Sequence, residues 1–201
     1  MSRKVEMPRR GLLRDSPGTA SVEFALVVSV FFLFVFGIID FNKAFWEMNS
    51  AAKAAQLGVR FAVVNDPVSD AVIFDGTAAG VPNGEPVPIA TFNGGAPVVC
   101  SRPAGSTVCD AGTADDDAFM AIVARMQQIN AGIQPENVIV SYEHIGLGFS
   151  GSPFGSSIDP MVTVRVTGLT LTLITPGLAQ LAASITIRDF ASTQLAEDLE
   201  S

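Results

Sequence analysis

The sequence is poor in the residue types on which most catalytic sites depend. It has one histidine, His144, so the Ser-His-Asp and Cys-His arrangements of nucleophilic catalysis would all rest on that side chain. We interpret His144 as a surface residue rather than a catalytic base. The glycine-rich stretch 146–155 lacks the lysine and the following helix of a phosphate-binding loop. We therefore expect a protein that is not an enzyme and that needs no cofactor.

Cysteine is equally scarce, with Cys100 and Cys109 as the two in the chain. Eight residues separate them, including Pro103 and Gly105. A zinc site would need about four ligands, and His144 lies far away in the sequence, so we expect no metal site. A disulfide that closes a local loop is favoured if the compartment is oxidising, with free thiols as the alternative.

Positive charge is concentrated in the first 18 residues. Residues 1–18 carry a net charge of +3, and the rest of the chain carries −11. An acidic body without a clustered basic face argues against nucleic acid as a partner. Nothing in the composition indicates a small-molecule substrate either.

An apolar run extends from Phe24 to Ile39, and Ser29 is its one polar residue. Extension back to Thr19 gives about the 20 residues that span a hydrocarbon core, at the cost of including Glu23. Bulky aromatics rather than a small-x-small cleavage site follow the run, so we expect a retained anchor rather than a cleaved signal peptide. The positive-inside rule predicts a single pass with the N-terminus cytoplasmic and the C-terminal body translocated.

The helix is expected to continue past the membrane, because no proline occurs between Pro17 and Pro67. The apolar residues of this stretch recur with alternating spacings of four and three, a heptad-like seam; they are Phe41, Phe45, Met48, Ala52, Ala55 and Val59. We expect the last three to pack on a sheet of the same chain, and Trp46 to be an interfacial anchor. The predicted organisation is a basic leader at 1–18, a transmembrane and amphipathic helix at 19–64, and a body at 65–201.

The body is predicted to be a small α+β domain with an antiparallel sheet packed on helices. Residues 65–114 read as loops with a strand-like piece at 87–92. The aspartates at 115–117 favour capping of a following helix over calcium binding, and Phe119, Ile122, Val123, Met126 and Ile129 share one face of it. Strands are expected at 137–143, 161–173 and 183–195, with a short helix or turn at 176–181.

The stretch GTASVEF, with Gly18, Thr19, Glu23 and Phe24, resembles the processing site of type IV prepilins. Residues 15–64 are similar to the TadE-like family of minor pseudopilins from tight-adherence (Tad, Flp or type IVb-like) pilus systems. The further matching residues are the Ala51–Ala55 stretch, Arg60 and Phe61. Ser29 departs from the pattern, since such proteins often carry proline there, and helix continuity is therefore expected.

This resemblance implies a pilin-like protein that takes part in assembly of an adhesive pilus. A prepilin peptidase would cut after Gly18, and Glu23 would then pair with the N-terminal amine of a neighbouring subunit. The implied partners are the inner membrane, the prepilin peptidase and other pilins or pseudopilins, with the head in the periplasm. The alternative is a permanently anchored periplasmic binding or sensor domain that is not processed.

Overall fold

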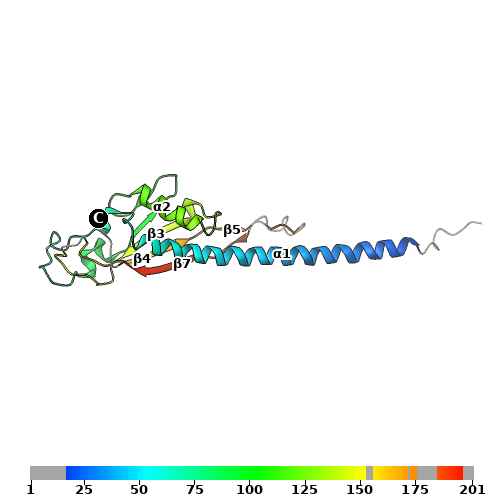
Figure 1. Ribbon diagram of the computed structural model, residues 1–201, viewed down its shortest axis with the longest axis horizontal. Coiled ribbons are helices and arrows are strands. Elements are labelled where there is room, and N and C mark those ends of the chain that lie inside the picture. Colours follow the sequence, from blue (N-terminus) through cyan, green and yellow to red (C-terminus); the bar gives the residue numbers. More distant parts are fainter. Residues whose placement is uncertain (1–16, 153–155, 172, 176–184, 197–201) are drawn as a thin grey trace, which may run out of the picture.

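A long helix and a small head make up the molecule (Figure 1). The computed structural model describes residues 17–152, 156–171, 173–175 and 185–196. Helix α1 spans Pro17–Ala62, which at 1.5 Å per residue is about 69 Å. Its N-terminal part projects away from the head, and its C-terminal part lies along it (Figure 1). The predicted α+β class, with a long N-terminal helix before an antiparallel sheet and a further helix, is confirmed.

Local sequence explains why α1 is continuous. Pro17 occupies the first helical position, where its missing N–H is not needed. Ser29 donates its hydroxyl to the Ala25 carbonyl at 2.8 Å, so this polar residue is accommodated within the apolar turns. The helix ends at Ala62, two residues before the expected boundary, and the Asn65 side chain donates to the Phe61 carbonyl at 2.7 Å.

The head contains a five-stranded antiparallel sheet in the order β2-β1-β3-β4-β7. Its strands are β1 (Val98–Ser101), β2 (Val108–Cys109), β3 (Val138–Glu143), β4 (Met161–Val166) and β7 (Phe190–Leu195). Register places Cys100, Val140 and Val164 in one row, and all three are buried. The opposite face is less buried and mixes polar with apolar residues, and Thr163 and Thr193 share a hydrogen bond there at 2.9 Å. One face is therefore the core side, as is common for antiparallel sheets.

Small residues on α1 allow the helix to approach the core closely. Its buried face consists of Ala51, Ala54, Ala55, Gly58, Val59 and Ala62. A Cβ added at Gly58 would lie 2.8 Å from the Met126 Cγ and 3.3 Å from a methyl of Val164. Met126 belongs to helix α2 (Asp116–Gln127), so Gly58 lies where α1, α2 and β4 meet. Burial of Ala55 and Val59 agrees with the predicted seam, whereas Ala52 is half-buried.

Several strand predictions need correction. The stretch 87–92 forms no strand; it holds the 3-10 helix η2 (Ile89–Thr91). The remaining 3-10 helices described are η1 (Asp70–Val72), η3 (Asn93–Gly95) and η4 (Pro135–Asn137). Strands β1 and β2 lie in the region predicted as loops. Ile129 lies beyond the end of α2 and is 43% exposed, so it does not join the helix's buried face.

The two longest predicted strands are each divided between two sheets. Residues 161–173 contain β4 and then β5 (Thr170–Leu171), and residues 183–195 contain β6 (Ile185–Thr186) and then β7. Gly168 adopts a φ of 67° between β4 and β5, a conformation that glycine reaches without a Cβ penalty. Strands β5 and β6 pair with each other in a separate two-stranded sheet. The helix or turn expected at 176–181 lies outside the described residues.

Candidate functional site

The predicted processing site lies in the first turns of α1. Gly18, Thr19, Glu23 and Phe24 are all exposed there, and a Cβ at Gly18 would meet nothing within 4 Å. Gly18, Thr19 and Glu23 line one side of a shallow hollow with Val22 and Leu26. The spacing of these residues puts them on one face of the helix. A peptidase that binds an extended backbone at Gly18 would have to unwind this first turn.

Residues 18–39 of α1 lie almost wholly outside the packed head. Judged by length and composition, α1 is long enough and apolar enough to cross a membrane, and it is the one such helix among the described residues. The most apolar 18-residue window has a mean hydropathy of 2.7 and is not buried at all. Phe24, Phe31 and Phe34 are each at least 60% exposed. Such a surface needs lipid or another apolar partner to cover it.

Asp40 ends the apolar run and is held by a distant part of the chain. Its carboxylate accepts hydrogen bonds from the backbone N–H groups of Ile174 at 2.8 Å and Thr175 at 2.9 Å, and from the Thr175 hydroxyl. Asp40 is only 6% exposed. Three donors to one carboxylate stabilise its charge where water is largely excluded. The segment after β5 is thereby fixed against α1.

We expect Asp40→Ala to release residues 174 and 175 from the helix. Loss of the acceptor leaves both N–H groups without the partner that protects them. Their amide exchange should accelerate roughly tenfold or more, while the amides of β3 and β4 keep their protection. Hydrogen exchange followed by mass spectrometry measures this. Asp66→Ala is the control, since Asp66 is an exposed aspartate just beyond the C-terminal end of α1. Unchanged exchange at 174 and 175 in the Asp40→Ala variant would contradict the expectation.

A second polar contact fixes α1 to the head about two to three turns further along. Asn130 follows α2, and its side-chain amide donates to Glu47 at 3.0 Å and to the Ser50 hydroxyl at 2.9 Å. Asn130 and Ser50 are each 7% exposed. From Ala51 onward the contact becomes apolar, through the small residues described above. The orientation of α1 relative to the head is thus set at Asp40, at Glu47 and Ser50, and in the core.

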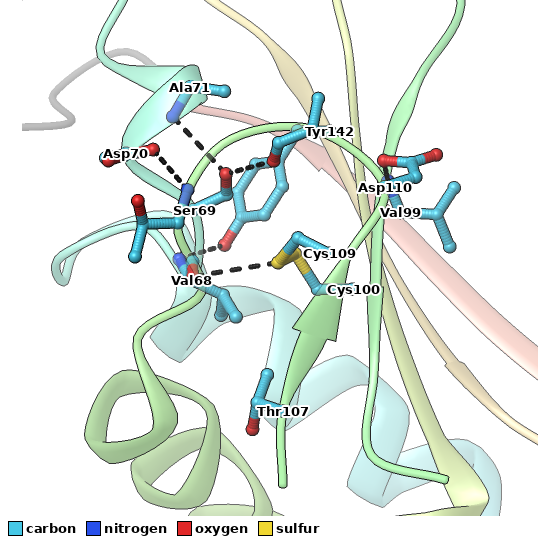
Figure 2. Close-up of a disulfide and its surroundings, with 12 residues drawn as sticks. Val68, Ser69, Asp70, Ala71, Val99, Cys100, Thr107, Cys109, Asp110 and Tyr142 are labelled. Atoms are coloured by element: carbon cyan, nitrogen blue, oxygen red, sulfur yellow. Dashed lines mark hydrogen bonds between the residues drawn. A yellow bond between two sulfur atoms is a disulfide. The ribbon is translucent and has the colours of Figure 1, made fainter.

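The disulfide joins the neighbouring strands β1 and β2 (Figure 2). Cys100 and Cys109 are directly opposite in the sheet register, so the bond closes the loop that connects the two strands. Cys100 is fully buried in the core. The pairing favoured from the sequence is present, and it fixes the edge of the sheet rather than a free loop.

The residues that follow α1 contact the sheet beside this disulfide (Figure 2). The Tyr142 hydroxyl accepts a hydrogen bond from the Val68 N–H at 3.0 Å, and Ser69 donates to the Ala111 carbonyl at 2.7 Å. Tyr142 is fully buried, and that burial raises its pKa to about 12. The phenol is therefore a neutral structural group at any physiological pH, and it ties the exit of α1 to β3.

The aspartates before α2 have structural partners. Asp115 caps the helix by accepting from the Ala118 N–H at 3.0 Å, as the sequence predicts. Asp116 accepts from the hydroxyl and N–H of Thr107, and it pairs with Arg102 at 3.1 Å. The Thr107 hydroxyl, more than any other group, lowers the pKa of Asp116. In the part of the chain that the structure describes, no three or more His, Cys, Asp or Glu are grouped to hold a metal.

His144 is buried, which corrects the prediction of a surface histidine. It is 3% exposed, and its Nε2 lies 2.9 Å from the Val87 carbonyl oxygen. The Phe92 ring packs edge-on against it, with ring centroids 6.2 Å apart. The side chain ties the loop before η2 to the end of β3. Sequence reasoning missed this because burial of a lone histidine depends on which loop covers it.

The contacts of Asp40 and Asn130 were also missed. Their positions gave little signal: Asp40 is simply the first ionisable residue after the apolar run, and Asn130 follows an amphipathic helix. Their partners lie 135 and 83 residues away in the chain. No local pattern indicates pairing over such distances.

Comparison with known proteins gives one finding for α1. A family model described as TadE-like protein matches residues 18–60, so the resemblance seen in the sequence is confirmed over nearly the whole of this helix. The match begins at Gly18 and ends within the part that packs on the head. No curated protein and no solved structure matches the chain significantly.

Proposed function

We propose, from the TadE-like segment at residues 18–60, that this chain is a membrane-anchored pseudopilin that takes part in assembly of a Tad-type pilus. TadE-like pilus components are structural proteins rather than enzymes. The observation that carries the proposal is the exposed apolar part of α1, preceded by Gly18 and holding Glu23 near its start. The head then lies on the periplasmic side, and the basic leader on the cytoplasmic side.

A prepilin peptidase is the proposed processing enzyme, with cleavage between Gly18 and Thr19. Glycine before the scissile bond presents no side chain to obstruct binding. Cleavage leaves Thr19 with a free amine as the first residue of the processed chain, and Glu23 is then its fifth residue. In a bundle of such helices, the Glu23 carboxylate pairs with the amine of a neighbouring subunit and compensates both charges in apolar surroundings.

The intact mass and N-terminal sequence of the protein from native membranes test this proposal. We expect a chain that begins at Thr19. Gly18→Val should leave the leader attached, because the added side chain blocks the peptidase. Gly37→Val is the matched control: it changes another glycine of the same helix where a Cβ also meets nothing within 4 Å, and processing should stay normal.

Two results would contradict the proposal. A native chain that begins near Met1 would indicate an unprocessed anchor and favour the binding or sensor domain. A chain that begins near Ala52 would indicate a cleaved signal peptide, which removes the membrane helix from the mature protein.

A further inference from the structure

Strand β5 and the nearby Thr175 lie beside α1, near the point where the helix leaves the head (Figure 1). We propose that the β5–β6 segment, here residues 170–171, 173–175 and 185–187, is a second membrane contact that inserts into the headgroup and upper acyl region of the bilayer beside α1. This inference rests on the proposed function, because it requires α1 to be a membrane anchor. The recognised partner is the lipid surface itself. Figure 1 shows β5 alongside α1, on the side of the head from which the free helix projects.

The first argument is the absence of charge. No Asp, Glu, Lys, Arg or His occurs from Val166 to Ile187, a stretch of 22 residues between Arg165 and Arg188. The chain beyond residue 18 is otherwise acidic, with a net charge of −11. Charged side chains are the costliest groups to bring into a bilayer. A long uncharged stretch in an acidic head fits contact with lipid.

The second argument is depth along α1. Thr175 and the helix together line a hollow of about 350 Å³, whose helix residues are Leu33, Phe34, Gly37, Ile38, Phe41 and Asn42. Leu33 lies six residues before Ile39, the end of the apolar run, which corresponds to about 9 Å along a helix. Elements that lie in the membrane interface reach about 5–10 Å into it. Thr175 is held at Asp40, so the segment meets α1 at the end of the apolar run and borders a hollow that extends along the helix to Leu33.

The third argument concerns the surface and backbone of the segment. Ile174 and Ile185 are 54% and 48% exposed, and the other exposed residues of the segment, Thr170 and Thr186, are uncharged. Its backbone groups have internal partners: β5 pairs with β6, and the N–H of Ile187 donates to the Leu169 carbonyl at 2.8 Å. The N–H groups of Ile174 and Thr175 are satisfied by Asp40. Paired backbone groups are the condition for any segment to enter lipid.

The fourth argument is the length of the span. Residues 24–39 measure about 24 Å as a helix, less than the roughly 30 Å of a hydrocarbon core, so the span is completed either back to Thr19, which includes Glu23, or on toward Phe45, which includes Asp40. Continuation to Phe45 gives about 33 Å, provided that Asp40 is shielded, which residues 174 and 175 do. Phe45 and Trp46 are 57% and 73% exposed, as suits aromatic residues at the interface. Lys43, within this extension, is long enough to bring its charge to the headgroups.

Depth-dependent fluorescence quenching tests the proposal on the full chain. Single cysteines at Ile174 or Ile185 are labelled with an NBD dye under non-reducing conditions, which keep Cys100 and Cys109 paired. The protein is placed in vesicles of phosphatidylethanolamine and phosphatidylglycerol, with and without lipids that carry a doxyl quencher near the top of the acyl chain. Emission from both positions should shift to the blue and fall roughly twofold or more with the quencher.

Two further labels separate the possible results. Ile89→Cys, on η2 and also 48% exposed, is the matched control and should stay unquenched. Leu33→Cys, measured in vesicles whose lipids carry the doxyl group deep in the acyl chain, reports on the anchor. Quenching at residue 33 but not at 174 or 185 would overturn this inference and leave the anchor intact, whereas no quenching at 33 would contradict the proposed function. A blue shift at 174 and 185 without doxyl quenching would assign the surface to a protein contact and also overturn the inference.

Discussion

Cells that carry Glu23→Ala in place of the native chain should assemble pili at a level lower by a factor on the order of 10²–10⁴. On the proposed function, the alanine would leave the N-terminal amine of the neighbouring subunit without its counter-charge in an apolar bundle. Removal of one partner of a buried ion pair costs about 3–5 kcal/mol, which corresponds to such a factor. Glu23 is exposed on α1 and lies far from the head, so stability of the head should not change.

Pilus counts by electron microscopy, with the amount of the chain in the membrane fraction, measure this effect. The variant should still reach the membrane, since alanine is more apolar than glutamate. Glu136→Ala, an exposed glutamate of η4, is the control for loss of a carboxylate and should leave assembly normal. Normal piliation with Glu23→Ala would argue for the anchored binding or sensor domain.

Reduction of the Cys100–Cys109 disulfide should lower the free energy of unfolding of the head by about 2.5–3 kcal/mol. The bond closes a loop of about ten residues, and that is the loop-entropy gain expected for this length. For a chain of this size the midpoint of thermal unfolding should fall by about 5–10 °C. Strand β2 is only two residues long and depends on the bond to stay in the sheet. Reduction should therefore lower the midpoint by more than the loss of the β1–β2 strand contact would by itself.

Calorimetry in detergent, with and without dithiothreitol, measures this contribution on the unaltered sequence. The double variant Cys100→Ala and Cys109→Ala should have the same low midpoint under both conditions. It should be at least as destabilised as the reduced chain, since Cys100 is fully buried and its replacement also leaves a small cavity. Ser106→Ala, in the same loop, is the control. Equal midpoints for the oxidised and reduced chain would show that the bond adds nothing.

The parts of the fold that depend on local pattern could be predicted from the sequence. Helix α1 follows from a long apolar run, the absence of proline and the heptad-like spacing beyond residue 40. Helix α2 and its Asp115 cap follow from an acidic start and one apolar face. Strand β3 follows from alternation over six residues. Each signal lies within one element, so no knowledge of the remaining chain was needed.

The failures concern elements whose state depends on a partner. Residues 98–101 and 108–109 form strands because β3 and the disulfide hold them at the sheet edge, although glycine and proline surround them. Residues 161–173 alternate, but at Gly168 the apolar positions shift from Val162, Val164 and Val166 to Leu169 and Leu171, and the left-handed turn there transfers the chain to a different sheet. This change of phase would place the apolar residues of one continuous strand on opposite faces, and it is the signal of two short strands that sequence reasoning missed.

The sequence by itself determined the long apolar helix and the pattern of the predicted processing site, because Gly18, Glu23 and the apolar run lie within a few turns of one helix. Tertiary structure alone decided how that anchor meets the head: Thr175 reaches Asp40, Asn130 reaches Glu47 and Ser50, and His144 lies under the loop before η2. The physical reason is the separation along the chain over which each interaction acts. Hydrophobicity and helix propensity act between residues a few positions apart, whereas a buried polar group takes whichever partner the folded chain brings to it.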